Sequence, residues 1–101
     1  MFRPIKVNQP KDLTRVQYRH WLPILTFCPA NNMPDLIYVT VESSEPYNLY
    51  DVRTKVRKLL SGKNIYMEEA CEQVGLVFPD ASAVEVRLAF NRHVVRMEFN
   101  V

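Results

Sequence analysis

Residues 48–79 have the sequence NLYDVRTKVRKLLSGKNIYMEEACEQVGLVFP, which predicts two consecutive helices in the middle of the chain. In the first helix, apolar residues recur at spacings of three and four and so form one stripe along a single side. That stripe consists of Leu49, Val52, Val56, Leu59 and Leu60. Asn48 is placed to cap the start of this helix, and Gly62 is placed to end it.

The second helix is predicted over about Tyr66 to Phe78, where Pro79 ends it. Glu68 and Glu69 lie in its first turn, where negative charge is favourable against the positive end of the helix dipole. Its apolar stripe consists of Met67, Ala70, Cys71, Val74 and Phe78.

Two strands are predicted before the helices. Residues 14–20 alternate between apolar and polar side chains, as in a half-buried strand. The apolar run at residues 21–27 contains Pro23, which predicts an edge strand or an irregular continuation. Prolines and asparagines make residues 28–35 a predicted loop, and residues 36–43 alternate again and predict the second strand.

Two further strands are predicted after the helices, at residues 84–90 and 95–101, with a turn near Asn91 and Arg92. The order hairpin, helix, helix, hairpin predicts an α+β fold, in which a four-stranded antiparallel sheet carries both helices on one face. We expect residues 1–13 to form an extended N-terminal arm and residues 14–101 to form a single domain. Because a lone sheet exposes its edges, we also expect a homo-oligomer whose strands join into a β-barrel.

Composition excludes several classes of function. The net charge of +2 is too small to indicate nucleic-acid binding by itself, and no aromatic and basic stripe typical of RNA-binding proteins is present. The cluster of basic residues within residues 53–63 is more typical of a solvated helix face than of a phosphate site. Only two glycines are present, too few for a phosphate-binding loop.

We expect a cytoplasmic protein, because no apolar run is long enough to span a bilayer and no signal peptide is evident. The two cysteines, Cys28 and Cys71, are then expected to be reduced thiols. Together with His20 and His93 they do not have the short spacings of zinc ligands, so we expect no metal site.

Cys28 and Asp35 are the first candidates for chemistry, in the segment CPANNMPD at residues 28–35. A thiolate attacks an electrophilic carbon, and a nearby carboxylic acid protonates the heteroatom on which negative charge appears. The alternative is structural, with Cys28 as a small buried apolar residue and Asp35 as a residue that caps the next strand.

Glu68 is the second candidate, in the segment NIYMEEA at residues 64–70. A carboxylate at a helix start can accept two N–H donors from the amidine edge of a guanine-like or pterin-like ring. The alternative is a solvated acidic first turn.

Together these segments resemble a known family. The element order is similar to the tunnelling fold, whose enzymes bind purines or pterins at subunit interfaces and hold the ring with a glutamate on the second helix. The segment CPANNMPD followed by LIYVTVE resembles the signature of 7-cyano-7-deazaguanine reductases, and NIYMEEA resembles their segment at the start of the second helix. The resemblance covers roughly residues 14–101.

The resemblance implies a role for each candidate residue. Cys28 would add to the nitrile carbon of 7-cyano-7-deazaguanine, either as the free base or within tRNA or DNA, and give a covalent thioimide. Asp35 would manage protons in that step, and Glu68 would hold the amidine edge of the base.

Two departures from the reductase pattern bear on the second step. The family's His-Glu pair is Met67-Glu68 here, and the stretch EPYNLY at residues 45–50 lacks the lysine and serine of the motif linked to the reduced nicotinamide cofactor. The short chain and the missing cofactor motif resemble the related amidinotransferases, which resolve the thioimide with ammonia, need no cofactor and make archaeosine-type bases, whereas Met67 in place of the histidine motivates a non-catalytic alternative. Reduction by NADPH is the alternative, as are an activity like dihydroneopterin aldolase and a non-catalytic module that binds purines or pterins.

Overall fold

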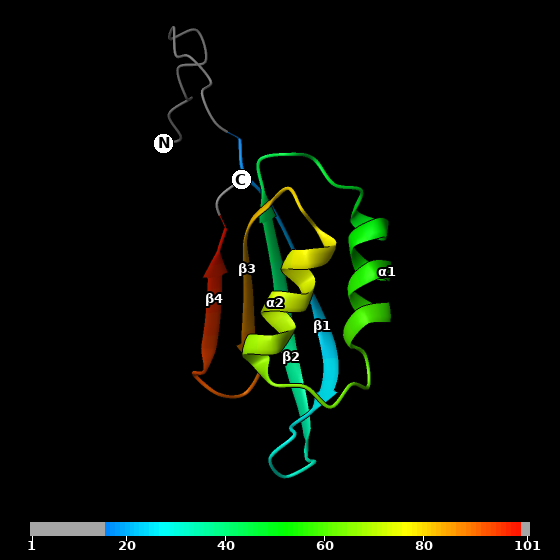
Figure 1. The fold of residues 1–101 in the computed structure, drawn as a ribbon, viewed down its shortest axis with the longest axis vertical. Coiled ribbons are helices and arrows are strands. Elements are labelled where there is room, and N and C mark those ends of the chain that lie inside the picture. Colours follow the sequence, from blue (N-terminus) through cyan, green and yellow to red (C-terminus); the bar gives the residue numbers. More distant parts are fainter. Residues whose placement is uncertain (1–15, 100–101) are drawn as a thin grey trace, which may run out of the picture.

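The computed structural model describes residues 16–99, which form a four-stranded antiparallel sheet and two helices (Figure 1). The strands lie in the order β1-β2-β3-β4 in the sheet. In the sequence, both helices come between β2 and β3. The elements are β1 (Tyr18–Phe27), β2 (Pro34–Ser43), α1 (Leu49–Leu60), α2 (Met67–Val77), β3 (Ala81–Leu88) and β4 (Val94–Glu98). This confirms the predicted α+β fold. The predicted arm at residues 1–13 lies outside the described residues.

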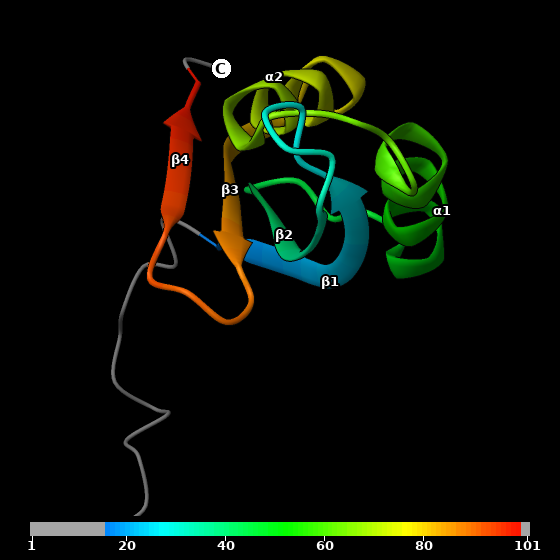
Figure 2. The same ribbon diagram turned by 90° about the horizontal axis from the view of Figure 1, so that it is seen from below.

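Both helices cover the same face of the sheet (Figure 2). Alternate strand residues point toward them, and the predicted helix stripes close the core from the other side. Burial of each such aliphatic side chain contributes roughly 1.5–3 kcal/mol to folding. The most deeply buried core residues include Ile37, Val39, Val41, Val52, Val56, Leu60, Val74, Val84 and Val86.

β1 is one continuous edge strand that contains Pro23. At its C-terminal end, the carbonyl of Leu25 accepts from the Gly62 N–H and the Phe27 N–H donates to the Lys63 carbonyl, both at 2.8 Å and both on the side away from β2. Backbone groups alternate in direction along a strand, so the nitrogen of Pro23 also lies on this outer side. The missing N–H therefore breaks no bond to β2, which confirms the predicted edge strand.

The helix ends agree with the predicted caps. The Asn48 side-chain oxygen accepts hydrogen bonds from the backbone N–H groups of Tyr50 and Asp51, at 2.9 and 3.2 Å. Gly62 has a φ of +73°, a left-handed conformation that glycine adopts without strain. These two residues fix where α1 begins and where the chain turns toward α2.

Four details of the sequence prediction were wrong. β2 begins at Pro34, so Asp35 belongs to the strand and not to the loop. Leu49 is 46% exposed, because as the first residue of α1 it lies outside the buried stripe. Phe90 is 91% exposed, because the Leu88 N–H already closes the β3-β4 turn onto the His93 carbonyl. β4 ends at Glu98, and Asn100 and Val101 lie outside the described residues.

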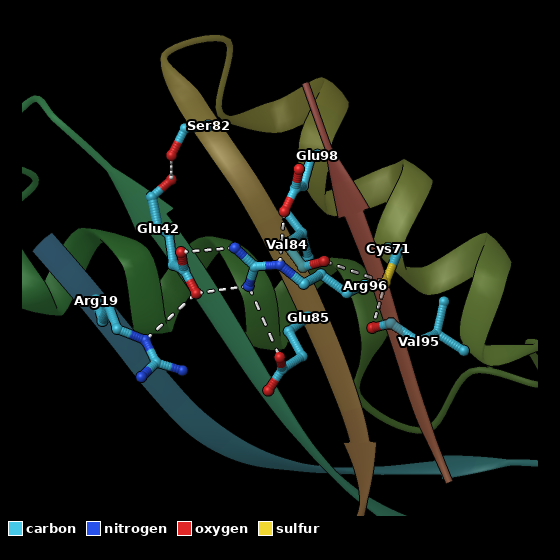
Figure 3. Close-up of polar contacts among 9 residues, drawn as sticks. All are labelled: Arg19, Glu42, Cys71, Ser82, Val84, Glu85, Val95, Arg96 and Glu98. Carbon is cyan, nitrogen blue, oxygen red and sulfur yellow. Dashed lines mark hydrogen bonds and ion pairs between the residues drawn. The ribbon is translucent and has the colours of Figure 1, made fainter. Parts of the chain in front are cut away.

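Charged side chains form ion pairs between the strands on the face away from the helices (Figure 3). Glu42 on β2 receives a two-pronged hydrogen bond from Arg96 on β4, at 2.7 and 3.0 Å, and an ion pair from Arg19 on β1 at 3.3 Å. Arg96 also pairs with Glu98 at 3.1 Å. The hydrogen bond from Arg96 holds the pKa of Glu42 below its ordinary value of 4.5, against an opposing effect of desolvation.

Replacing this carboxylate tests the contribution of the network. Glu42→Gln is expected to lower the free energy of unfolding by roughly 1–2 kcal/mol near neutral pH, because it removes the carboxylate that binds Arg96 through two hydrogen bonds and leaves Arg96 with Glu98. The pKa of Glu42 is lowered in the folded state, so its contribution is complete above 4.5 and is lost as the pH falls through the lowered pKa. Urea unfolding followed by circular dichroism at neutral and acidic pH measures both effects.

The control is Glu72→Gln, which changes an exposed carboxylate on α2. A difference between Glu42→Gln and the parent protein that stays constant from neutral to acidic pH would contradict this assignment of the Glu42 charge.

Candidate active site at the open end of the hairpin

Cys28 lies directly after β1, in the loop that leads to β2. The loop is closed by two backbone hydrogen bonds, from the Cys28 N–H to the Met33 carbonyl at 2.9 Å and from the Asn32 N–H to the Cys28 carbonyl at 2.7 Å. Asn32 has a φ of 58°, a conformation that asparagine tolerates better than most residues. Cys28 is half-buried, and its main chain is fixed on both sides.

The segment from Gly62 to Ile65 binds this loop to the start of α2. The Phe27 N–H donates to the Lys63 carbonyl at 2.8 Å, and the Ile65 N–H donates to the Phe27 carbonyl at 2.9 Å. The side-chain amide of Asn64 donates to the side-chain oxygen of Asn32 at 2.8 Å. The loop that holds Cys28 and the turn that leads into α2 are therefore hydrogen-bonded together.

Glu68 is the second residue of α2, three residues after Ile65. It is exposed, and the start of α2 lies at the same end of the domain as the loop between β1 and β2 (Figure 1). The preceding cap residue, Tyr66, forms no side-chain cap hydrogen bond. The sequence placed Cys28 and Glu68 forty residues apart, and the fold brings their elements to one end of the sheet.

Asp35 approaches the same end from β2. It pairs across the sheet with Thr26, and the Thr26 hydroxyl donates to its backbone carbonyl at 3.5 Å. Cross-strand partners point to the same face, and Thr26 is buried on the helix side, so the half-buried Asp35 side chain also points toward the helices. All three predicted residues thus belong to elements that meet at one end of the domain.

Three surface hollows within residues 16–99 lie away from the candidate residues. They are lined by other side chains, and none of the three includes Cys28, Asp35 or Glu68.

The second cysteine, Cys71, has a structural position. Cys71 is fully buried on α2, and its thiol donates weakly to the carbonyls of Val84 and Val95, at 3.7 and 3.6 Å. Burial raises the pKa of the Cys71 thiol to about 11. Within residues 16–99 no three His, Cys, Asp or Glu side chains are grouped so as to hold a metal ion.

The sequence reasoning missed Asn32 and Asn64. Their hydrogen bond joins the Cys28 loop to the turn before α2, although they are separated by 32 residues. The signal available in the sequence was the adjacent pair Asn31 and Asn32, in a loop bounded by prolines. Such a pair indicates that one asparagine has a left-handed backbone conformation, but it does not indicate the contact with Asn64.

Comparison with known proteins finds a similar fold among solved structures but no match by sequence. No protein-family model matches the chain, and no curated protein matches its sequence. Among solved structures, the chain is similar to that of an archaeosine synthase QueF-like protein in the apo form, with a TM-score of 0.62 and 19% sequence identity. The similarity covers 81% of this chain and 91% of that one. The two chains share the tunnelling fold. None of the helices described here is long and apolar enough to cross a membrane.

The two cysteines are expected to differ sharply in reactivity. Iodoacetamide at neutral pH should modify the native protein once, at Cys28, because Cys71 is buried with a raised thiol pKa. Intact-mass measurement should show a second modification only in denaturant. Cys28→Ser should remain unmodified when native, and rapid native labelling of that variant would contradict the buried position of Cys71.

Proposed function

We propose that this chain is a covalent enzyme that acts on the nitrile of 7-cyano-7-deazaguanine and forms a thioimide at Cys28. The observation that carries the proposal is a pair of hydrogen bonds, from the Phe27 N–H to the Lys63 carbonyl and from the Ile65 N–H to the Phe27 carbonyl, which fixes the Cys28 loop against the start of α2. The shared fold with an archaeosine synthase QueF-like protein supports it.

In the first step, the thiolate of Cys28 forms a bond to the nitrile carbon and one π bond of the nitrile breaks. The electron pair moves to the nitrile nitrogen, which takes up a proton. Asp35 is proposed to supply that proton, since a nitrile is a weak electrophile and adds a thiolate only when its nitrogen is protonated. Glu68 is proposed to accept two N–H donors from the amidine edge of the base, a charge-assisted pair that fixes its orientation.

In the second step, ammonia is proposed as the co-reactant. It adds to the thioimide carbon, the carbon–sulfur bond breaks, and the electron pair returns to the Cys28 sulfur. One proton from the ammonia restores the thiol, and the base leaves as an amidine. The stretch at residues 45–50 supports ammonia over NADPH as the co-reactant, because two of its residues have structural roles in the fold. Tyr47 packs against Phe78 with ring centroids 5.3 Å apart, and Asn48 caps α1.

A homo-oligomer is proposed to complete the site. β1 and β4 are the edge strands of the sheet, and the segment at residues 62–65 occupies the outer side of β1 only at its C-terminal end. Joining the free part of β1 to β4 of another copy would satisfy both edges and extend the sheet toward a barrel. It would also bring a second chain to the open end that holds Cys28.

The oligomer is tested by light scattering. We expect a mass that is a multiple of the 11.9 kDa chain, and the substitution of a residue on the free outer edge, Arg19→Pro, should lower it by removing one edge N–H. The matched control is Arg19→Ala, which removes the same side chain and keeps the edge N–H. A monomer at working concentration would contradict the proposed assembly.

The covalent step is tested by intact-mass spectrometry after incubation with 7-cyano-7-deazaguanine. We expect an added mass of one base per chain, formed without loss of atoms because the thiol adds across the nitrile. Cys28→Ala should form no adduct, whereas Cys71→Ala should still form it. An adduct that persists in Cys28→Ala, or no adduct in the parent chain, would contradict the proposal.

The second reactant is tested with the preformed adduct. Ammonia should release the base as an amidine, and NADPH should leave the adduct unchanged. Release of an aminomethyl base by NADPH would instead support the reductase. Activity on a pterin that survives Cys28→Ala would support an aldolase-like protein, and tight binding of the base without turnover would support a non-catalytic module.

A further inference from the structure

The sheet face opposite the helices carries an aromatic and basic cluster that the proposed Cys28 chemistry does not use. Cross-strand register places Trp21 on β1 opposite Thr40 on β2, and Thr40 opposite Glu85 on β3. The next row places Tyr38 on β2 opposite Arg87 on β3. The chain order separates these residues by up to 66 positions, which is why no aromatic and basic stripe is visible in the sequence.

Trp21 and Tyr38 form the aromatic part of this cluster. Their rings pack edge to face, with centroids 5.6 Å apart and an interplanar angle of 74°. Trp21 is nevertheless 62% exposed, so the edge of Tyr38 supports the ring and a large part of its surface stays open to solvent. A fixed, open indole is a stacking platform for a flat ring.

Two arginines flank this platform. A surface hollow of about 570 Å³ is lined by Trp21, Tyr38, Thr40, Glu85, Arg19 and Arg87. Arg87 forms no ion pair with any residue in the range 16–99, and Arg19 shares Glu42 with Arg96, which already engages both Glu42 oxygens. Arg87 is therefore the arginine beside the aromatic pair that can still bind an anion.

We propose that this hollow binds a nucleotide, with its base stacked on Trp21 and its phosphate held by Arg87. The volume lies within the range of roughly 300–1,000 Å³ that small-molecule sites occupy. Arginine binds phosphate through paired N–H donors, and Glu85 and Thr40 offer acceptors to exocyclic amino groups on the base. This site is separate from Cys28, and its existence does not depend on the proposed thioimide chemistry.

A second copy of the chain is the competing occupant of this face. Face-to-face packing would bury Arg19, Arg87 and Glu85 against their own copies and would desolvate charges without new partners. The proposed edge-to-edge assembly pairs strand edges and does not stack this face against a second sheet. Charge complementarity therefore favours a phosphate-bearing ligand over a second sheet.

The experiment uses Trp21, which is the only tryptophan in the chain. Adenosine 5′-monophosphate, guanosine 5′-monophosphate and a short single-stranded RNA are titrated into the full chain while tryptophan fluorescence is recorded. Stacking is expected to quench the emission with a saturating curve, and adenosine without phosphate is expected to bind more weakly. Binding of the mononucleotides identifies a free nucleotide as ligand, and binding of the RNA alone identifies a nucleotide within a strand.

Variants locate the binding. Arg87→Ala should weaken binding at least about tenfold, because it removes a charge-assisted contact to phosphate. The matched control is Arg57→Ala, an exposed arginine on α1, which should bind like the parent chain. Trp21→Ala, followed by equilibrium dialysis, should lose binding, whereas Tyr50→Ala, an exposed aromatic on α1, should retain it.

Absence of quenching by all three phosphate ligands in the millimolar range would overturn the proposal, as would binding that is unaffected by Arg87→Ala and Trp21→Ala. A change of oligomeric state in Trp21→Ala without any nucleotide binding to the parent chain would identify the face as a subunit contact instead. Adduct formation at Cys28 should be unaffected in Arg87→Ala, so failure here and failure of the proposed function are distinguishable.

Discussion

The hydrogen bonds of Phe27 are the interaction on which the candidate active site depends. Phe27 ends β1 and pairs with Pro34 of β2 on one side, while its N–H and carbonyl bind Lys63 and Ile65 on the other. The last strand residue before Cys28 is therefore held between the sheet and the connection of the two helices. Removing the connection would free both the Cys28 loop and the start of α2, which carry the proposed nucleophile and the proposed base-binding carboxylate.

The rest of the fold supplies the rigidity that this junction requires. The apolar stripes of α1 and α2 close over the inward residues of the sheet, and Asn48 and Gly62 set the length of α1. On the opposite face, Glu42 joins Arg19 and Arg96 from the two edge strands (Figure 3). The sheet is thus fixed by packing on one face and by charge on the other.

Sequence reasoning located the elements whose signal is local. Helical stripes repeat every three or four residues, and caps depend on residues at fixed offsets, so Asn48, Gly62 and the stripe of α2 could be predicted. It failed where pairing between distant segments decides the outcome. The start of β2 at Pro34 and the exposed Phe90 follow from cross-strand hydrogen bonds, and the contact between Asn32 and Asn64 follows from the path of the chain after α1. The cluster of Trp21 with Arg87 arises only when three strands align.

The proposed function requires that Cys28 and Glu68 act on one bound base. A crystal structure of the chain after incubation with 7-cyano-7-deazaguanine would show whether they do. We expect continuous electron density between the Cys28 sulfur and the former nitrile carbon, with a Glu68 carboxylate at the amidine edge of the same base. A base bound without contact to Cys28, or an adduct whose amidine edge faces solvent with no Glu68 beside it, would overturn the proposed function.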